Sequence, residues 1–132
     1  MRGLSYWCFA SATLYVTAGM LLGIGMAASG NHVLASAHAH LNLVGWVSMA
    51  LYAVFYHAFP DIAQSRAAKV HFVLATIGVW TMVPGIALAV IGRGEGLAVL
   101  GSLMTLVSMV LFAGLVFSAG MSARSTVRTA GV

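Results

Sequence analysis

The chain has 132 residues, of which 61% are hydrophobic and 6% are charged, and its mean hydropathy is +1.01. Because a soluble domain carries about 25% charged residues, this composition excludes an ordinary water-soluble domain and predicts an integral membrane protein. The formal net charge of +4 is dispersed between apolar stretches and therefore does not indicate a nucleic-acid-binding surface. The length predicts a single domain, residues 1–132, with no separate soluble module.

Four apolar segments are long enough to cross a bilayer, which takes about 20 residues of helix. Turn-forming residues separate them. The first segment ends at the string Ser29-Gly30-Asn31, the second at Pro60-Asp61, and the third at the turn Gly92–Gly96. The sequence therefore predicts an all-α membrane protein whose four transmembrane helices lie at about residues 4–28, 36–59, 68–91 and 97–121.

The basic residues indicate how these helices are oriented. With one exception they precede the first span, lie between the second and third, or follow the fourth: Arg2, Arg66, Lys69, Arg124 and Arg128. The opposite side carries only Arg93, which Glu95 offsets. Because cytoplasmic loops carry an excess of Lys and Arg, we expect both termini and the 61–69 loop to be cytoplasmic.

Small residues recur at helical spacing in two of the spans. They form one ridge in the first span and another in the fourth: Gly19, Gly23 and Ala27, and Gly101, Thr105 and Ser108. Small side chains let helix backbones approach closely in a membrane. Tight helix contacts are therefore predicted at both ridges, either within one chain or between copies.

Five histidines stand out because ionisable residues at membrane depth usually face a protein interior or a cavity. They lie in the first loop, at the start and the end of the second span, and at the start of the third: His32, His38, His40, His57 and His71. His32 is expected to be a solvated loop residue. His57 and His71, near the cytoplasmic boundary, are expected to anchor their spans, and a second metal site built from this pair is the alternative.

His38 and His40 are the strongest candidates for ligation. Two residues on, a helix has turned by about 200°, so these side chains cannot bind one metal ion from the same side. Each can ligate a separate centre, and neutral imidazole is a common axial ligand of haem iron. Asn42, one turn after His38, is expected to hydrogen-bond across helices or to orient a ligand, and Gly45 to leave room for a flat macrocycle. With Trp46 they form the predicted cofactor site.

The string from His38 to Trp46, which continues to an aromatic-rich end and Pro60, resembles the second transmembrane helix of the catalytic subunit of haem–copper oxidases. The nitric oxide reductase branch is the most similar. In that family a histidine directly before a Leu-Asn-Leu string is an axial ligand of the low-spin haem, and His40 matches that position. The resemblance covers the second span strongly and the other spans only in length and order.

The resemblance implies a haem b membrane cytochrome that transfers electrons, or binds nitric oxide or oxygen, near the outer face of a bacterial inner membrane. A family subunit has twelve spans in three arcs of four helices, and this chain supplies one arc. It follows that a homotrimer would rebuild the ring, with His38 facing one inter-subunit haem and His40 the next. The sequence has no counterpart of the family's copper ligands, and no residue is assigned a catalytic role.

Two other functions stay open. His32, His38 and His40 can gather a copper or zinc ion at the outer surface for transport or delivery, with Met residues as soft ligands for copper(I). A structural membrane protein without a cofactor is the other alternative. The single cysteine, Cys8, excludes a disulfide within one chain and is expected to be a small buried or lipid-facing residue.

Overall fold

The structure is a computed structural model that describes the backbone of residues 1–130 and the side chains of residues 1–120. It is 87% helical, and residues 1–130 contain no strand. Within the described residues, four helices are long and apolar enough to cross a membrane: Leu4–Ser29, Ala35–Ala58, Arg66–Val90 and Gly96–Gly120. The prediction of an all-α protein with four candidate membrane spans is confirmed, and every bound lies within two residues of the expected one.

The helices follow one another as α1 (Leu4–Ser29), α2 (Ala35–His40), the π-helix η1 (Leu41–Val47), α3 (Ser48–Ala58), α4 (Pro60–Ala63), α5 (Arg66–Val90) and α6 (Gly96–Ala130). α2, η1 and α3 are continuous and together form the second span. Gly30 ends α1 with a φ of 66°, a left-handed conformation that glycine adopts without strain. Ser65 caps α5, because its hydroxyl accepts a hydrogen bond of 3.1 Å from the Ala68 N–H.

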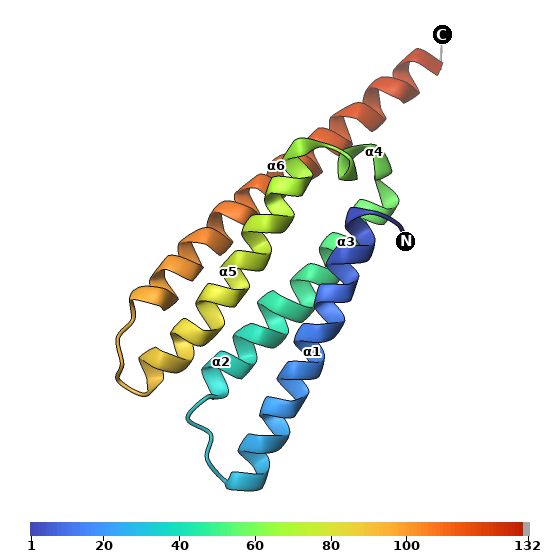
Figure 1. Ribbon diagram of the computed structural model, residues 1–132. Coiled ribbons are helices and arrows are strands. Elements are labelled where there is room, and N and C mark those ends of the chain that lie inside the picture. Colours follow the sequence, from blue (N-terminus) through green and yellow to red (C-terminus); the bar gives the residue numbers. More distant parts are fainter. Residues whose placement is uncertain (131–132) are drawn as a thin grey trace.

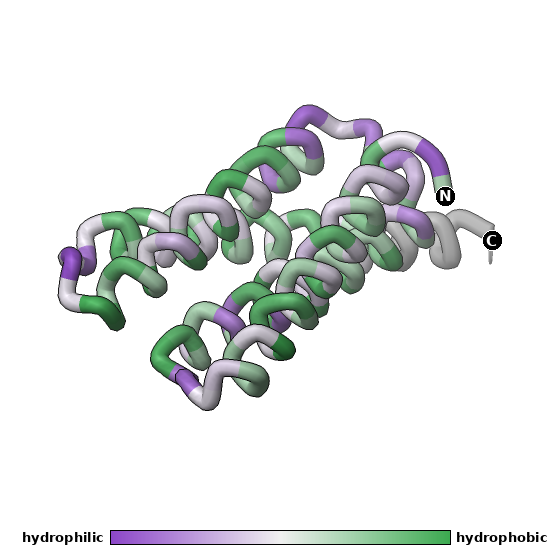
Figure 2. The backbone as a smooth tube through the Cα atoms, turned by 60° about the horizontal axis from the view of Figure 1, so that its bottom comes forward, coloured by the Kyte–Doolittle hydropathy of each residue, from purple (hydrophilic) through white to green (hydrophobic). Residues whose placement is uncertain are grey.

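The spans are arranged as two helical hairpins (Figure 1). α1 packs along the second span, and α5 packs along α6. The two hairpin loops lie at one end of the molecule, and the N-terminus, α4 and the end of α6 lie at the other. Figure 2 shows apolar residues along the helices and hydrophilic residues gathered at the loops, as expected of helices that contact lipid. The side chains of Arg124 and Arg128 lie outside the described residues.

The predicted ridge of small residues on the fourth span packs inside the chain. Gly101 of α6 lies directly against the backbone of Met82 in α5. A Cβ added to Gly78 would come within 2.8 Å of the Thr105 hydroxyl oxygen. The next small residue, Ser108, is buried, and its hydroxyl donates a hydrogen bond of 3.4 Å to the carbonyl of His71. These contacts hold α5 and α6 together at short range.

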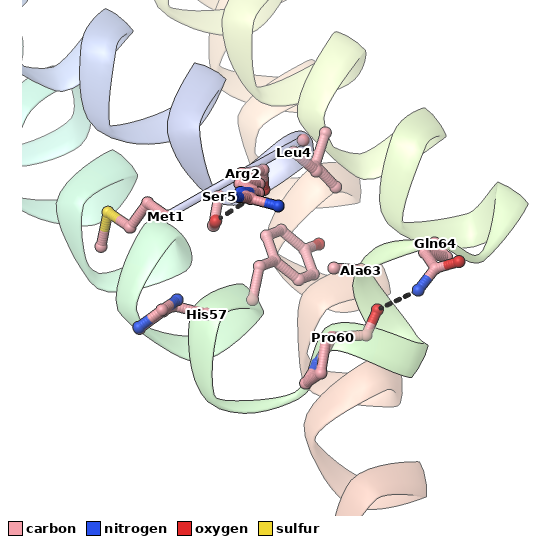
Figure 3. Close-up of a pocket in the computed structure, with 10 residues that line it drawn as sticks. Met1, Arg2, Leu4, Ser5, His57, Pro60, Ala63 and Gln64 are labelled. Carbon is pink, nitrogen blue, oxygen red and sulfur yellow. Dashed lines mark hydrogen bonds between the residues drawn. The ribbon is translucent and has the colours of Figure 1, made fainter.

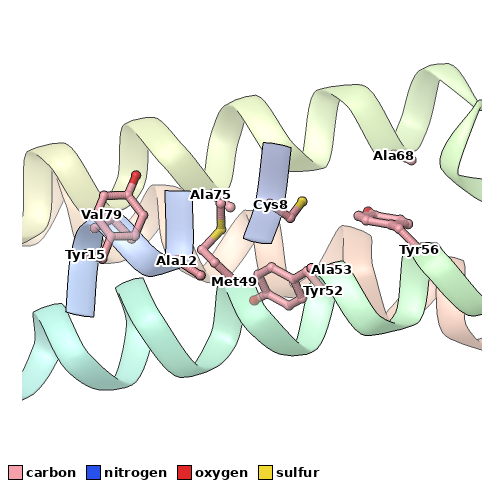
Figure 4. Packing of buried hydrophobic residues seen from close by; sticks show 10 residues of the cluster. All are labelled: Cys8, Ala12, Tyr15, Met49, Tyr52, Ala53, Tyr56, Ala68, Ala75 and Val79. Atoms are coloured by element: carbon pink, nitrogen blue, oxygen red, sulfur yellow. The ribbon is translucent and has the colours of Figure 1, made fainter. Parts of the chain in front are cut away.

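A core forms where the two hairpins meet, toward the end that carries the termini. It consists of buried side chains from α1, the second span and α5 (Figure 4): Cys8, Ala12, Tyr15, Met49, Tyr52, Ala53, Tyr56, Ala68, Ala75 and Val79. Cys8 has no exposed surface, which confirms the expectation for the single cysteine. The hairpin loops at the opposite end lie apart from each other (Figures 1 and 2).

Candidate functional site

His38 and Asn42 lie against the glycine ridge of α1. A Cβ added to Gly23 would come within 3.0 Å of Cε1 in the His38 ring, so the missing side chain makes room for the imidazole. One turn away, a Cβ added to Gly19 would lie 2.6 Å from the side-chain oxygen of Asn42. The small residues predicted to bring helices together therefore accommodate the two polar side chains of the second span.

Asn42 holds a fixed position beside His38, as their one-turn spacing predicts. Its amide nitrogen donates a hydrogen bond of 2.9 Å to the backbone carbonyl of His38 and lies 3.4 Å from Nδ1 of the same residue. The shorter contact goes to the backbone, so the amide is held mainly by that bond. His38 itself is half-buried between α1 and the second span.

His40 is held in a single ring orientation by its own helix. Its Nδ1 lies 2.8 Å from the backbone carbonyl oxygen of Ser36. Because a carbonyl can only accept, this contact requires the hydrogen on Nδ1, and in the neutral ring the lone pair is then at Nε2. Nε2 has no hydrogen-bond partner among the described residues. Metal-ligating histidines show this same arrangement, with one ring nitrogen bound to a carbonyl and the other free for the metal.

The surface around His40 is open. Its neighbours on the same face, Ser36 and Leu43, are exposed, and Leu43 is 62% exposed. On the side that faces α1, Gly45 and Met49 are buried. Ionisable side chains of membrane-spanning helices usually face a protein interior or a cavity and seldom face lipid. The geometry of His40 therefore suits ligation of a group that lies outside the single chain.

The π-helix η1 begins directly after His40. A π-helix is marked by backbone hydrogen bonds that reach five residues back. The Ser48 N–H donates such a bond to the carbonyl of Leu43, and the Ser48 hydroxyl donates to the same carbonyl at 3.0 Å. Such turns are rare and occur frequently at functional sites. No residue pattern in the string signals it, because the residues from Leu41 to Val47 are equally compatible with an α-helix.

Gly45 and Trp46, the other two predicted site residues, pack against α1. A Cβ added to Gly45 would lie 3.2 Å from the Tyr15 side chain, so Tyr15 fills the space that was expected to receive a macrocycle. Trp46 is half-buried, and its ring lies edge-on to Phe9 with the ring centroids 6.4 Å apart. Within one chain these two residues serve helix packing, and His38, His40 and Asn42 carry the polar part of the site.

The remaining histidine at this end of the molecule lies in the loop between α1 and α2. His32 is exposed in the loop, and its Nδ1 lies 3.3 Å from the Gly30 carbonyl. Within the described part of the chain, no three His, Cys, Asp or Glu side chains come together in a way that would hold a metal ion. The three-histidine copper or zinc site is therefore not assembled within the described chain.

His71 is fully buried, which differs from the boundary anchor that its sequence position suggests. Its Nδ1 lies 2.8 Å from the hydroxyl of Tyr56, and its Nε2 has no hydrogen-bond partner among the described residues. The ring lies edge-on to Tyr52 at 4.5 Å between centroids and 5.2 Å from Phe112. This pair links the first hairpin to the second. His57, by contrast, is exposed, as an anchor would be.

A cavity of about 590 Å³ opens at the end of the molecule that carries the termini, between α1, α3 and α4. Figure 3 shows Arg2, Ser5 and Gln64 around it, and Tyr56 contributes to its wall. The Ser5 hydroxyl donates a hydrogen bond of 3.0 Å to the Arg2 carbonyl. The cavity lies at the far end of the second span from His38 and His40, so it is separate from the histidine site.

Comparison with known proteins gives no relative from which a function can be transferred. No family model, curated protein or solved structure matches the chain.

Proposed function

We propose that the chain is a haem-binding membrane cytochrome and that His40 is an axial ligand of the haem iron. The observation that carries the proposal is the bond of 2.8 Å from Nδ1 to the Ser36 carbonyl, which fixes the ring and leaves Nε2 for a ligand. When bound, haem supplies one-electron exchange or coordination of a diatomic gas such as nitric oxide or oxygen.

His38 is proposed as the second ligand, directed to a different pocket from His40. Its contact with Gly23 places it on the α1 side of the second span, while His40 lies between exposed residues. Two histidines with different surroundings suit an assembly in which each serves its own haem. If each haem takes a histidine from two chains, both axial positions are filled, which favours electron transfer over gas binding.

We propose a homotrimer in which three four-helix chains rebuild a twelve-helix ring, as a compact relative of the haem–copper oxidase catalytic subunit. The open surface around His40 supports contact with another chain. The fourth span, Gly96–Gly120, supports it as well. Only 11% of its most apolar stretch is buried inside the chain, against 22% to 28% in the other three spans. Lipid or a neighbouring chain must therefore cover most of α6.

We place the histidine site near the outer face of a bacterial inner membrane, with both termini in the cytoplasm. Arg2, Arg66 and Lys69 are at the end of the molecule that carries the termini. Arg93, in the loop between α5 and α6, is at the opposite end together with Glu95. This asymmetry supports the orientation through the positive-inside rule.

The first test is the visible absorption spectrum of the purified protein, oxidised and then reduced with dithionite. A sharp Soret band with split α and β bands on reduction is the expected result for six-coordinate haem. His40→Gln should abolish these bands, whereas His57→Gln, at the exposed end of the same span, should retain them. A colourless wild-type protein, produced with an ample haem supply, would contradict the proposal.

The mass of the detergent-solubilised complex tests the assembly separately. A mass of three chains is expected, and a monomer or dimer would refute the ring while leaving haem binding to be judged by the spectrum. His32→Gln distinguishes the two cofactor classes, because it should spare haem but weaken a copper or zinc site at the outer surface.

A further inference from the structure

The cavity at the end of the molecule that carries the termini combines a cationic side chain with apolar walls. It has a volume of about 590 Å³ and lies between the start of α1, the end of α3 and α4. Arg2 and Gln64 contribute polar groups to it (Figure 3), and Leu4 and Ala63 are among its apolar lining. None of the described residues that line it is acidic, and Asp61 of α4 is not among them. The cavity therefore favours a negatively charged ligand that also has an apolar part.

The Arg2 guanidinium is free to bind such a ligand. Arg2 is exposed, and no side chain among residues 1–120 forms an ion pair or a hydrogen bond with its guanidinium. The Ser5 hydroxyl donates a hydrogen bond of 3.0 Å to the Arg2 carbonyl, which ties Arg2 to the start of α1. On the α4 side, the Gln64 amide nitrogen donates to the Pro60 carbonyl at 3.4 Å and has a second N–H left for a ligand. Because a guanidinium binds phosphate through parallel N–H bonds, phosphate is the anion that these donors suit.

The cavity lies where the spans end, at the level expected for the headgroups of a bilayer. Tyr6 and Trp7, at the start of α1 directly after the lining residues Leu4 and Ser5, are both exposed. Exposed Tyr and Trp side chains of membrane proteins gather where the hydrocarbon meets the headgroups. At the same end of the molecule, the start of α5 adds the positive charge of Arg66 and Lys69. Headgroup phosphates of the membrane itself are therefore within reach of the cavity.

We propose that this cavity binds the headgroup of an anionic phospholipid, whose phosphate accepts hydrogen bonds from the Arg2 guanidinium and the Gln64 amide. Leu4 and Ala63 then contact the apolar part of the same lipid. The volume is within the range of about 300–1,000 Å³ found for small-molecule sites. A zwitterionic headgroup also carries an amine cation, and no carboxylate lines the described cavity to receive it. Basic pockets between transmembrane helices on the cytoplasmic side are known to bind anionic headgroups. The proposal depends neither on haem nor on the trimer.

The test is a titration of the full chain, purified in a neutral detergent, with short-chain phosphatidylglycerol, and the bound fraction is read by native mass spectrometry. Wild type should bind it saturably and about tenfold more tightly than phosphatidylcholine of the same chain length. Arg2→Gln removes the charged donor and should weaken binding by about tenfold, whereas Gln64→Leu removes a neutral donor and should weaken it by about threefold. Arg66→Gln is the matched control, because it removes the same charge from the same end of the molecule without touching the cavity.

Each outcome decides the question. The three substituted side chains are exposed, so all three variants should elute in gel filtration as the wild type does. Equal weakening by Arg2→Gln and Arg66→Gln would report a general attraction of anionic lipid to a basic surface and overturn the proposal. Equal affinities for the two lipids would overturn it as well. Glycerol phosphate carries the same anion without acyl chains, and its displacing the lipid at equal concentration would show that the ligand is a soluble phosphate. A colourless protein that binds phosphatidylglycerol as expected would refute the haem proposal and leave the lipid site standing.

Discussion

Replacing Gly101 by alanine tests the close contact between α5 and α6. A Cβ at this position would overlap the Met82 backbone and lie 2.6 Å from the Met82 Cβ. Backbone atoms cannot rotate away, so the helices must move apart. Overpacking of this kind costs about 1–3 kcal/mol, and alanine recovers about 1 kcal/mol as the better helix former. We expect the free energy of unfolding to fall by up to about 2 kcal/mol.

Gly114 provides the matched control on the same helix. A Cβ added there meets nothing within 4 Å, so Gly114→Ala keeps the gain in helix propensity and has no overlap. The two variants should therefore differ by the overpacking cost alone, about 1–3 kcal/mol.

Thermal unfolding in detergent can be followed by the reaction of Cys8 with a thiol-reactive fluorophore. Cys8 is the only cysteine and has no exposed surface, so its labelling reports opening of the core. Gly101→Ala should become reactive at a lower temperature than Gly114→Ala. Equal midpoints for the two variants would refute the close contact between α5 and α6.

Two further predictions concern the buried pair and the orientation. Tyr56→Phe removes the hydrogen bond of 2.8 Å to His71 and should lower the free energy of unfolding by about 1–3 kcal/mol in the same assay. The control Tyr6→Phe, which changes an exposed ring, should leave the free energy of unfolding unchanged. Equal effects of the two substitutions would show that the bond contributes nothing. In a cysteine-free background, Glu95→Cys should react with a membrane-impermeant maleimide on intact spheroplasts, and Gln64→Cys should not react. Labelling of Gln64→Cys alone would show that the topology is the reverse of the proposed one.

The spans could be predicted closely because hydrocarbon thickness fixes their length and polar turns mark their ends. The sequence places Asn42 one helical turn after His38, but its hydrogen bond to the His38 backbone carbonyl was not predicted. The pairing of Tyr56 with His71 could not be predicted, because the two residues belong to different spans whose relative rotation is set by packing. For the same reason the sequence did not reveal that Tyr15 fills the space beside Gly45.

The π-helical segment sets the direction in which the histidines face relative to the rest of the second span. A π-helical turn takes in one residue more than an α-helical turn, and one residue corresponds to about 100° of rotation in an α-helix. The same residues wound as a continuous α-helix would turn His38 and His40 by roughly a quarter of a circle relative to Tyr56, with every side chain of the site still present. Deleting a single residue between Leu41 and Val47 would instead remove the extra residue, so that the span could close into an α-helix while the histidines keep their direction. The backbone form of this segment is therefore a determinant of the site in its own right.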